Sequence, residues 1–183
     1  FPAGRVELTS EDAALKTIAL PGAQTAAARP GPAGGAPTFP PAGNMAQLMR
    51  GVLFPAANMI FNVQRYDPGQ PPSKTNLSKE AGFSWVDWGA GIYKPWELVD
   101  YAAVALAESA PLMLTPGRRC ENGKLVPVDR PDWIKFTEEL AQAGRDAYKA
   151  SQTRNQEVVS DATNQIADSC LHCHEVYRDR PAG

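Results

Sequence analysis

Residues 155–178 carry apolar side chains at intervals of three and four residues, which is the spacing of one face of an α-helix. A helix with a single apolar face is stable only when that face packs against another element. Two of the three cysteines belong to this face, and the only two histidines, His172 and His174, lie beside them. The residues of the face are Val159, Ala162, Ile166, Cys170, Cys173 and Tyr177.

Three further segments, at 44–65, 94–114 and 130–152, show the same helical period, and no alternating run of strand length is visible. Asn44 is a suitable N-cap for the first segment, and Pro95 and Pro131 fall in the first turns of the others. Pro55 lies inside the first segment and predicts a kink there. The predicted fold class is therefore all-α, an antiparallel four-helix bundle. The predicted apolar faces are Leu48, Val52, Met59 and Val63 in the first segment, Val99, Ala102, Leu106 and Ala110 in the second, and Trp133, Phe136, Leu140, Ala143 and Ala147 in the third.

The chain divides by composition into two predicted units. Residues 1–43 form an extended N-terminal arm, because 21–43 consist almost entirely of Ala, Pro and Gly and cannot bury enough apolar surface to order themselves. Residues 44–183 form the helical bundle. Its first two helices are separated by an aromatic-rich insert, 66–94, for which a cap over a bundle end and a partner site both stay open.

Charge and hydropathy exclude several classes of partner. The 183-residue chain has a net charge of −2 and a pI near 5.7 without a long basic run, so nucleic acid and anionic membrane surfaces are not expected partners. No apolar run approaches the roughly 20 residues needed to cross a bilayer. No signal peptide is visible at Phe1, so the protein is either cytosolic or exported with its signal removed.

The sequence Cys170-Leu-His-Cys173-His174 fits C-x-x-C-H, the attachment signature of c-type haem. Two thiols at this spacing lie on one side of the chain, where each can form a thioether with one vinyl group. The histidine directly after the second thiol can then bind the iron as proximal ligand. The motif predicts one covalently attached haem c, with His174 as the metal ligand.

Two other uses of these cysteines are less consistent with the sequence. A redox Cys-x-x-Cys pair is expected near a helix N-terminus, which lowers thiol pKa values, whereas this pair comes late in its helix. A zinc site would need Cys120 and a histidine in addition to Cys170 and Cys173, and structural zinc sites usually pair two separated two-ligand segments.

Haem attachment also bears on the compartment. Haem c is attached outside the cytoplasm in bacteria, so a periplasmic location with a removed signal peptide is the better account of Phe1. Cys120, in the connection 115–130, is then an odd cysteine in an exported protein. An inert loop thiol, a link to another chain and a disulfide with a partner all stay open for it.

With these residues in view, the chain resembles the cytochrome c prime family. The string CLHCHEVYR, residues 170–178, matches the family pattern C-x-x-C-H-x-x-[YF]-R in full, and LMRGVLF and DWIKF resemble parts of its first and third helices. The resemblance covers 44–66 and 95–178 and implies a four-helix bundle with one haem c on the last helix. Residues 1–43 and most of 66–94 have no counterpart in compact family members.

The resemblance implies roles for four residues besides the motif itself. Tyr177 would pack along the helix, and Arg178 would lie by the proximal haem face. Arg50 would pair with a haem propionate, and Phe54 would cover the open face of the iron. Solvated surface positions for the two arginines and ordinary core packing for Phe54 are the alternative interpretations. Family members are commonly homodimers joined through their first two helices, which makes a second copy one expected partner.

Counting ligands narrows what the iron could do. Apart from His174, the chain has only His172, which lies between the cysteines on the wrong side of the haem, so a bis-histidine haem within one chain is excluded. Without a sixth ligand the iron is five-coordinate and binds small diatomic gases such as nitric oxide and carbon monoxide. With Met49 as sixth ligand the protein is an electron carrier only.

The predicted function is thus a periplasmic monohaem c-type cytochrome that exchanges electrons with redox partner proteins, binds nitric oxide or carbon monoxide, or does both. The alternative is a haem-bearing subunit of a larger redox complex, with the arm and the aromatic insert as docking surface. An enzyme acting on small nitrogen or oxygen species is a third hypothesis, although no distal residues for peroxide cleavage can be assigned from the sequence.

Overall fold

The computed structural model describes residues 39–70 and 92–178. These residues form helices and connections, and the strand-like feature among them is an isolated bridge between Arg119 and Leu125. The all-α prediction is confirmed for the described part of the chain. Most of the predicted arm and of the insert, including Phe83, Trp85 and Trp88, lies outside the described residues.

The first helical segment begins where the sequence places its cap. Asn44 and Gln47 form a reciprocal capping box in which each side chain accepts a hydrogen bond of 2.9 Å from the other residue's backbone N–H. The segment consists of α1 (Met45–Leu48), a π-helical turn (Met49–Leu53), α2 (Phe54–Phe61) and a 3₁₀ turn (Asn62–Gln64).

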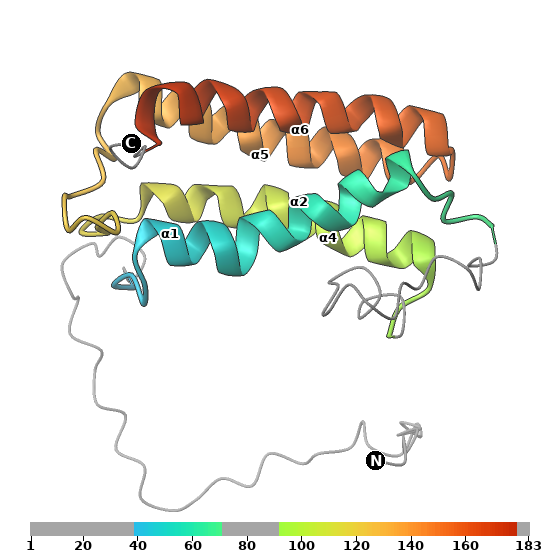
Figure 1. The fold of residues 1–183 in the computed structure, drawn as a ribbon, viewed down its shortest axis with the longest axis horizontal. Coiled ribbons are helices and arrows are strands. Elements are labelled where there is room, and N and C mark those ends of the chain that lie inside the picture. The colour runs from blue at the N-terminus through green and yellow to red at the C-terminus, as the bar shows by residue number, and fades with distance from the viewer. Residues whose placement is uncertain (1–38, 71–91, 179–183) are drawn as a thin grey trace, which may run out of the picture. The chain divides into compact units, whose positions relative to one another are not determined.

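The kink expected at Pro55 takes the form of this wide π-helical turn. The backbone N–H of Phe54 bonds to the carbonyl of Met49, five residues earlier, directly before the proline that has no N–H to donate. Figure 1 shows the segment rising along α2 toward α6 after this turn. The helix therefore continues through Pro55 but changes course there.

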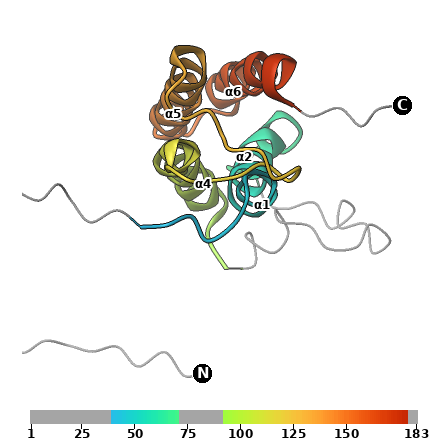
Figure 2. The ribbon, with the colours of Figure 1, turned by 90° about the vertical axis from the view of Figure 1, so that its left-hand side faces the viewer.

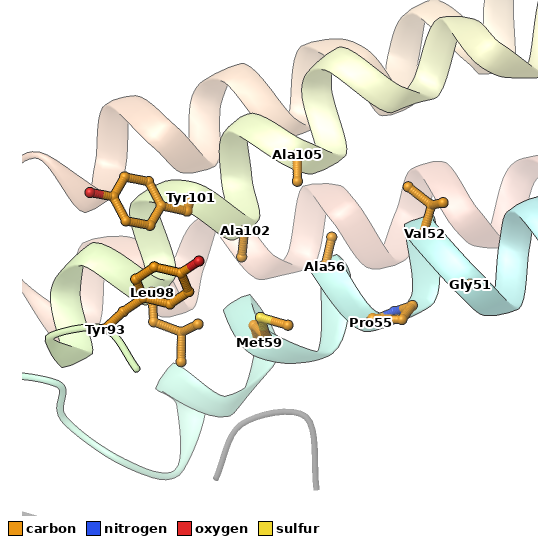
Figure 3. Close-up of a pocket in the computed structure, with 10 residues that line it drawn as sticks. All are labelled: Gly51, Val52, Pro55, Ala56, Met59, Tyr93, Leu98, Tyr101, Ala102 and Ala105. Carbon is orange, nitrogen blue, oxygen red and sulfur yellow. The ribbon is translucent and has the colours of Figure 1, made fainter. Parts of the chain in front are cut away.

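The wide turn also shifts which residues face the core. Leu48 and Leu53, five residues apart, are both buried, and Ile60 and Val63 follow on the same buried face. Val52 and Met59, predicted for this face, are only half-buried. They line a groove beside α4, as Figure 3 shows. Both side chains still pack against the core, as predicted, although the residues of this segment that are buried most deeply are Leu53, Ile60 and Val63.

The other three helices match their predicted segments closely. They are α4 (Pro95–Ser109), extended by a 3₁₀ turn (Ala110–Leu114), α5 (Pro131–Ser151) and α6 (Gln156–Tyr177). Asn155 caps α6 by accepting hydrogen bonds from the backbone N–H groups of Glu157 and Val158, at 2.9 and 3.2 Å. The predicted faces of these helices are buried, except that Phe136, Cys170 and Tyr177 are half-buried.

The helices lie side by side, with α5 packed between α4 and α6 and with α2 against α4 (Figures 1 and 2). Their buried faces meet in one core. The start of α1, the end of α4, the start of α5 and the end of α6 lie at the same end, at the left of Figure 1. Within residues 39–70 and 92–178, no helix is long and apolar enough to span a membrane.

The connection 115–130 crosses this end and fixes the start of α1. The backbone N–H of Met45 donates to the carbonyl of Arg119 at 2.8 Å, and the guanidinium of Arg118 donates to the carbonyl of Gly43 at 2.7 Å. Arg118 is buried and also bonds to the carbonyl of Leu112. These contacts hold three segments that are distant in sequence at the end where the C-x-x-C-H motif lies.

Candidate functional site

The motif residues occupy the last turns of α6. Cys173 is buried in the core, whereas Cys170 and His174 are half-buried, and both cysteines pack against the core cluster. The two thiols are three residues apart on a continuous helix, so they lie on the same side, and His174 follows within the same turn. Among the described residues, Cys120, Cys170 and Cys173 form no disulfide with one another.

Burial decides the protonation of these thiols. It raises the pKa of Cys170, and it raises the pKa of Cys173 to about 11, with further contributions from Cys170 and Asp132. Reactive redox cysteines need the opposite shift, because the thiolate is the nucleophile. The structure therefore provides two neutral thiols on an apolar helix face rather than an activated pair.

The imidazole of His174 is held in its neutral form. Burial lowers its pKa, and the positive charge of Arg178 lowers it further. The backbone N–H of Arg178 also donates to the carbonyl of His174 at 3.3 Å, directly after the helix ends. The structure thus brings the predicted Arg178 and His174 together, and a neutral imidazole is the form that binds a metal ion.

Tyr177 connects the end of α6 to the start of α5. Its ring meets the ring of Trp133 edge to face, with 4.8 Å between the ring centroids, and the ring of Phe136 at 6.3 Å. Its hydroxyl donates to Oδ2 of Asp132 at 2.7 Å. The guanidinium of Arg130 holds both oxygens of the same carboxylate at 3.1 and 3.0 Å.

Asp132 and Arg130 were not predicted as site residues. The sequence shows Asp132 in the first turn of a helix, where a carboxylate stabilises the helix N-terminus. This role alone accounts for an aspartate at that position, so the sequence gives no reason to expect a side-chain partner for it. No feature of the sequence indicates that α6 supplies a hydroxyl to it from 45 positions away.

Arg50, predicted to pair with a haem propionate, and Phe54, predicted to cover the open face of the iron, lie on the first helical segment. Arg50 is exposed and forms an ion pair with Glu121 of the connection 115–130 at 3.0 Å, so its pairing with a propionate stays a prediction. The side chain of Phe54 is 61% exposed, although its neighbour Leu53 is buried. Met49, the candidate sixth ligand, is half-buried and packs against the core.

The first helical segment contacts α6 mainly at the far end from the motif. There Gln64 donates to Oγ1 of Thr163 at 2.6 Å and Gln156 donates to the carbonyl of Val63 at 2.8 Å. Both ribbon views show α1 set apart from the end of α6 that carries Cys170, Cys173 and His174 (Figures 1 and 2). The structure therefore places the motif and the segment containing Arg50 and Phe54 at the same end without packing α1 against the end of α6.

His172 is exposed and lies close to α5. Its Nδ1 lies 3.5 Å from Oε2 of Glu139 on α5, and its side chain is 53% exposed. That His172 is not an iron ligand stays a prediction. Cys120 is half-buried in the connection 115–130, where its backbone N–H donates to the carbonyl of Lys124 at 2.8 Å.

An apolar groove of about 280 Å³ lies between α2 and α4 and is separate from the motif. Figure 3 shows Val52, Pro55 and Met59 on one side and Leu98 and Tyr101 on the other. Its lining contains neither a cysteine nor a histidine, so it does not belong to the predicted haem site.

The donor set suits haem c better than a metal ion bound by side chains alone. Among the described residues, no group of three or more His, Cys, Asp or Glu could hold a metal ion, which gives the zinc alternative no support. Haem iron requires only one or two protein ligands, because the porphyrin supplies the others. The two cysteines on one helix face and the imidazole beside them are compatible with that donor set.

Comparisons of the chain with protein-family models, with curated proteins and with solved structures gave no match.

Proposed function

We propose that this chain is a periplasmic monohaem c-type cytochrome, similar to cytochrome c prime, built as an antiparallel four-helix bundle. The observation that carries the proposal is the placement of Cys170, Cys173 and His174 together on the last turns of α6, half-buried or buried against the core. Cys170 and Cys173 would hold one haem c through thioethers, and His174 would be the axial ligand.

When bound, haem supplies an iron that alternates between ferric and ferrous states and can bind a diatomic gas at an open position. The chain's contribution is to present the two attachment cysteines on one face of α6, to favour the unprotonated imidazole of His174, and to exclude water with the core residues around Cys173. Arg178, beside His174, adds a positive charge on the proximal side.

The distal side decides between gas binding and electron transfer alone. Phe54 is a large apolar side chain, 61% exposed, on the first helical segment, and an apolar cover would leave the iron five-coordinate and open to nitric oxide or carbon monoxide. Met49 is the alternative, because a thioether ligand would close the sixth position. The exposure of Phe54 favours the first arrangement, since a large ring left in water is the one that gains most from contact with haem.

A second candidate is a haem-bearing subunit of a larger redox complex. The apolar groove between α2 and α4, with the exposed aromatic pair Tyr93 and Tyr101 at its edge, favours contact with a protein, either a different partner or a second copy of the chain. The size of the native assembly distinguishes this candidate from a discrete monomer.

The proposal is tested on protein produced in a host that attaches haem c. We expect an absorption spectrum of covalent haem that survives denaturation and acid–acetone extraction, and a broad ferrous band that changes when carbon monoxide is added. The variant C173S should retain one thioether at most and C170S likewise, whereas C120S should be unaffected. Protein purified from such a host without covalent haem would overturn the proposal, and sharp ferrous bands indifferent to carbon monoxide would assign the sixth position to Met49.

A further inference from the structure

The end of α6 is tied to the start of α5 by a phenol–carboxylate hydrogen bond. The hydroxyl of Tyr177 donates to Oδ2 of Asp132 at 2.7 Å, and its ring lies against Trp133. Asp132 is itself fixed on several sides. The guanidinium of Arg130 donates to both carboxylate oxygens, and the backbone N–H of Trp133 donates to Oδ1 at 3.1 Å. The acceptor is therefore held in place before Tyr177 bonds to it.

This bond acts on the turn that carries the proposed iron ligand. Tyr177 is the last residue of α6, three residues after His174 and four after Cys173, and the chain becomes extended at Arg178. A helix end usually frays, because its last carbonyls have no intrahelical partners. Here two residues anchor the final turn. Cys173 is buried in the core, and Tyr177 bonds to Asp132 of α5. A movement of this turn would carry the imidazole of His174 with it.

We propose that Tyr177 and Asp132 are positioning residues that fix the orientation of His174 by clamping the last turn of α6 to the first turn of α5. This inference rests on the proposed function, since it concerns the ligand of a bound haem. Neither residue needs to touch the iron or a substrate.

The hydrogen bond and the ring packing can be separated by substitution. Y177F keeps the edge-to-face contact with Trp133 and removes only the donor. D132A removes the acceptor, whereas D132N removes the charge but keeps a carbonyl oxygen that can accept from Tyr177. The control is N155A, which removes two capping hydrogen bonds at the other end of the same helix and leaves the clamp intact.

Two measurements on the purified full-length holoprotein test the clamp. The iron–histidine stretching band in the resonance Raman spectrum of the ferrous protein reports the geometry of His174, and amide hydrogen exchange reports opening of the last turn of α6. In Y177F and D132A we expect a shifted or broadened iron–histidine band. We also expect about ten- to a hundredfold faster exchange at residues 173–177, because each variant loses a hydrogen bond to a charged group. D132N should fall between wild type and D132A, because its single amide oxygen can accept from Tyr177 but cannot also accept from the donors that now bond to Oδ1. N155A should speed exchange only at the start of α6.

The outcomes separate the inference from the proposed function. An unchanged iron–histidine band in Y177F overturns the inference, and so does an equal shift in N155A, because the effect would then follow stability rather than position. A wild-type protein without covalent haem would show no such band at all and would overturn the proposed function instead. In that case, faster exchange at 173–177 in Y177F would still demonstrate the clamp in the chain itself.

Discussion

Gly144 of α5 lies so close to α4 that a Cβ added to it would be 2.7 Å from the backbone nitrogen of Ala107 and 2.9 Å from its Cα. Real Cβ atoms do not approach a backbone this closely, so the absence of a side chain at 144 sets the distance between the two helices. The predicted apolar face of α5 included the neighbouring Ala143 but not Gly144, although both are buried.

Replacing Gly144 by alanine should therefore destabilise the protein. Alanine is about 1 kcal/mol better than glycine in a helix interior, but pushing α5 away from the backbone of α4 costs about 1–3 kcal/mol. We expect a lower free energy of unfolding for G144A, measured by urea denaturation. G51A is the matched control, because Gly51 is exposed with nothing within 4 Å of its Cβ position, and it should unfold at the same or a higher urea concentration. A G144A variant as stable as G51A would contradict the close contact.

The helices were predictable because their apolar faces recur with a regular period, but the register of the first one was not. The spacing from Leu48 to Val52 fits an ordinary α-helix, whereas the structure buries Leu48 and Leu53. A π-helical turn adds one residue to the helix. In the sequence only Pro55 indicates a disturbed helix there, and it does not show at which position the extra residue lies. Long-range packing against α4 and α6 decides that point.

The candidate site likewise contains residues that the sequence predicts and residues that become apparent only in the structure. Cys170, Cys173 and His174 were proposed as haem-binding residues from their spacing alone, and the structure places them together on the last turns of α6. Asp132 could not be predicted, since its relation to Tyr177 exists only once α5 and α6 pack together. Arg50 was assigned by resemblance, and the structure shows that it has a partner in Glu121, which the sequence does not indicate across 71 positions.

The turn between α5 and α6 should respond differently to glycine and to alanine at position 154. Arg154 has a φ of 54°. Its guanidinium donates hydrogen bonds of 2.8 Å to both carboxylate oxygens of the buried Asp100. Losing these bonds should cost about 2 kcal/mol in R154A and in R154G alike. Glycine relieves the left-handed strain, so R154G should retain about 1 kcal/mol more stability than R154A.

Urea denaturation of both variants checks this expectation, and the difference between them isolates the backbone from the ion pair. Asp100 keeps its bonds from Ser151 and Gln152, at 2.6 and 2.9 Å, in either variant, so the fold should persist. Equal stability of R154G and R154A would show that the left-handed conformation at 154 carries no strain.

Alkaline pH should weaken the contact between α5 and α6. Burial and the hydrogen bond to Asp132 raise the pKa of Tyr177 to about 12, above the value near 10 of an unfolded tyrosine. The native state then keeps a proton that the unfolded state loses, so this contribution to stability is complete below about pH 10 and is lost as the pH rises toward 12. Y177F should lose less stability than wild type between about pH 9 and pH 11. A parallel decline of the two proteins over this range would contradict the raised pKa.

The attachment thiols should react slowly in any fraction of the protein that lacks haem. The pKa of Cys173 is about 11, compared with about 9 for an ordinary thiol, so its thiolate fraction near neutral pH is roughly a hundredfold lower. We expect alkylation of Cys173 by iodoacetamide to be about tenfold or more slower than that of a model thiol in native conditions, because the higher nucleophilicity of a high-pKa thiolate offsets part of its lower abundance. In urea the rate should reach that of the model thiol. In the holoprotein neither Cys170 nor Cys173 should react even when unfolded, because a thioether has no free thiol. Rapid alkylation of native Cys173 at neutral pH would instead favour a redox pair, since an accessible thiolate is what disulfide exchange requires.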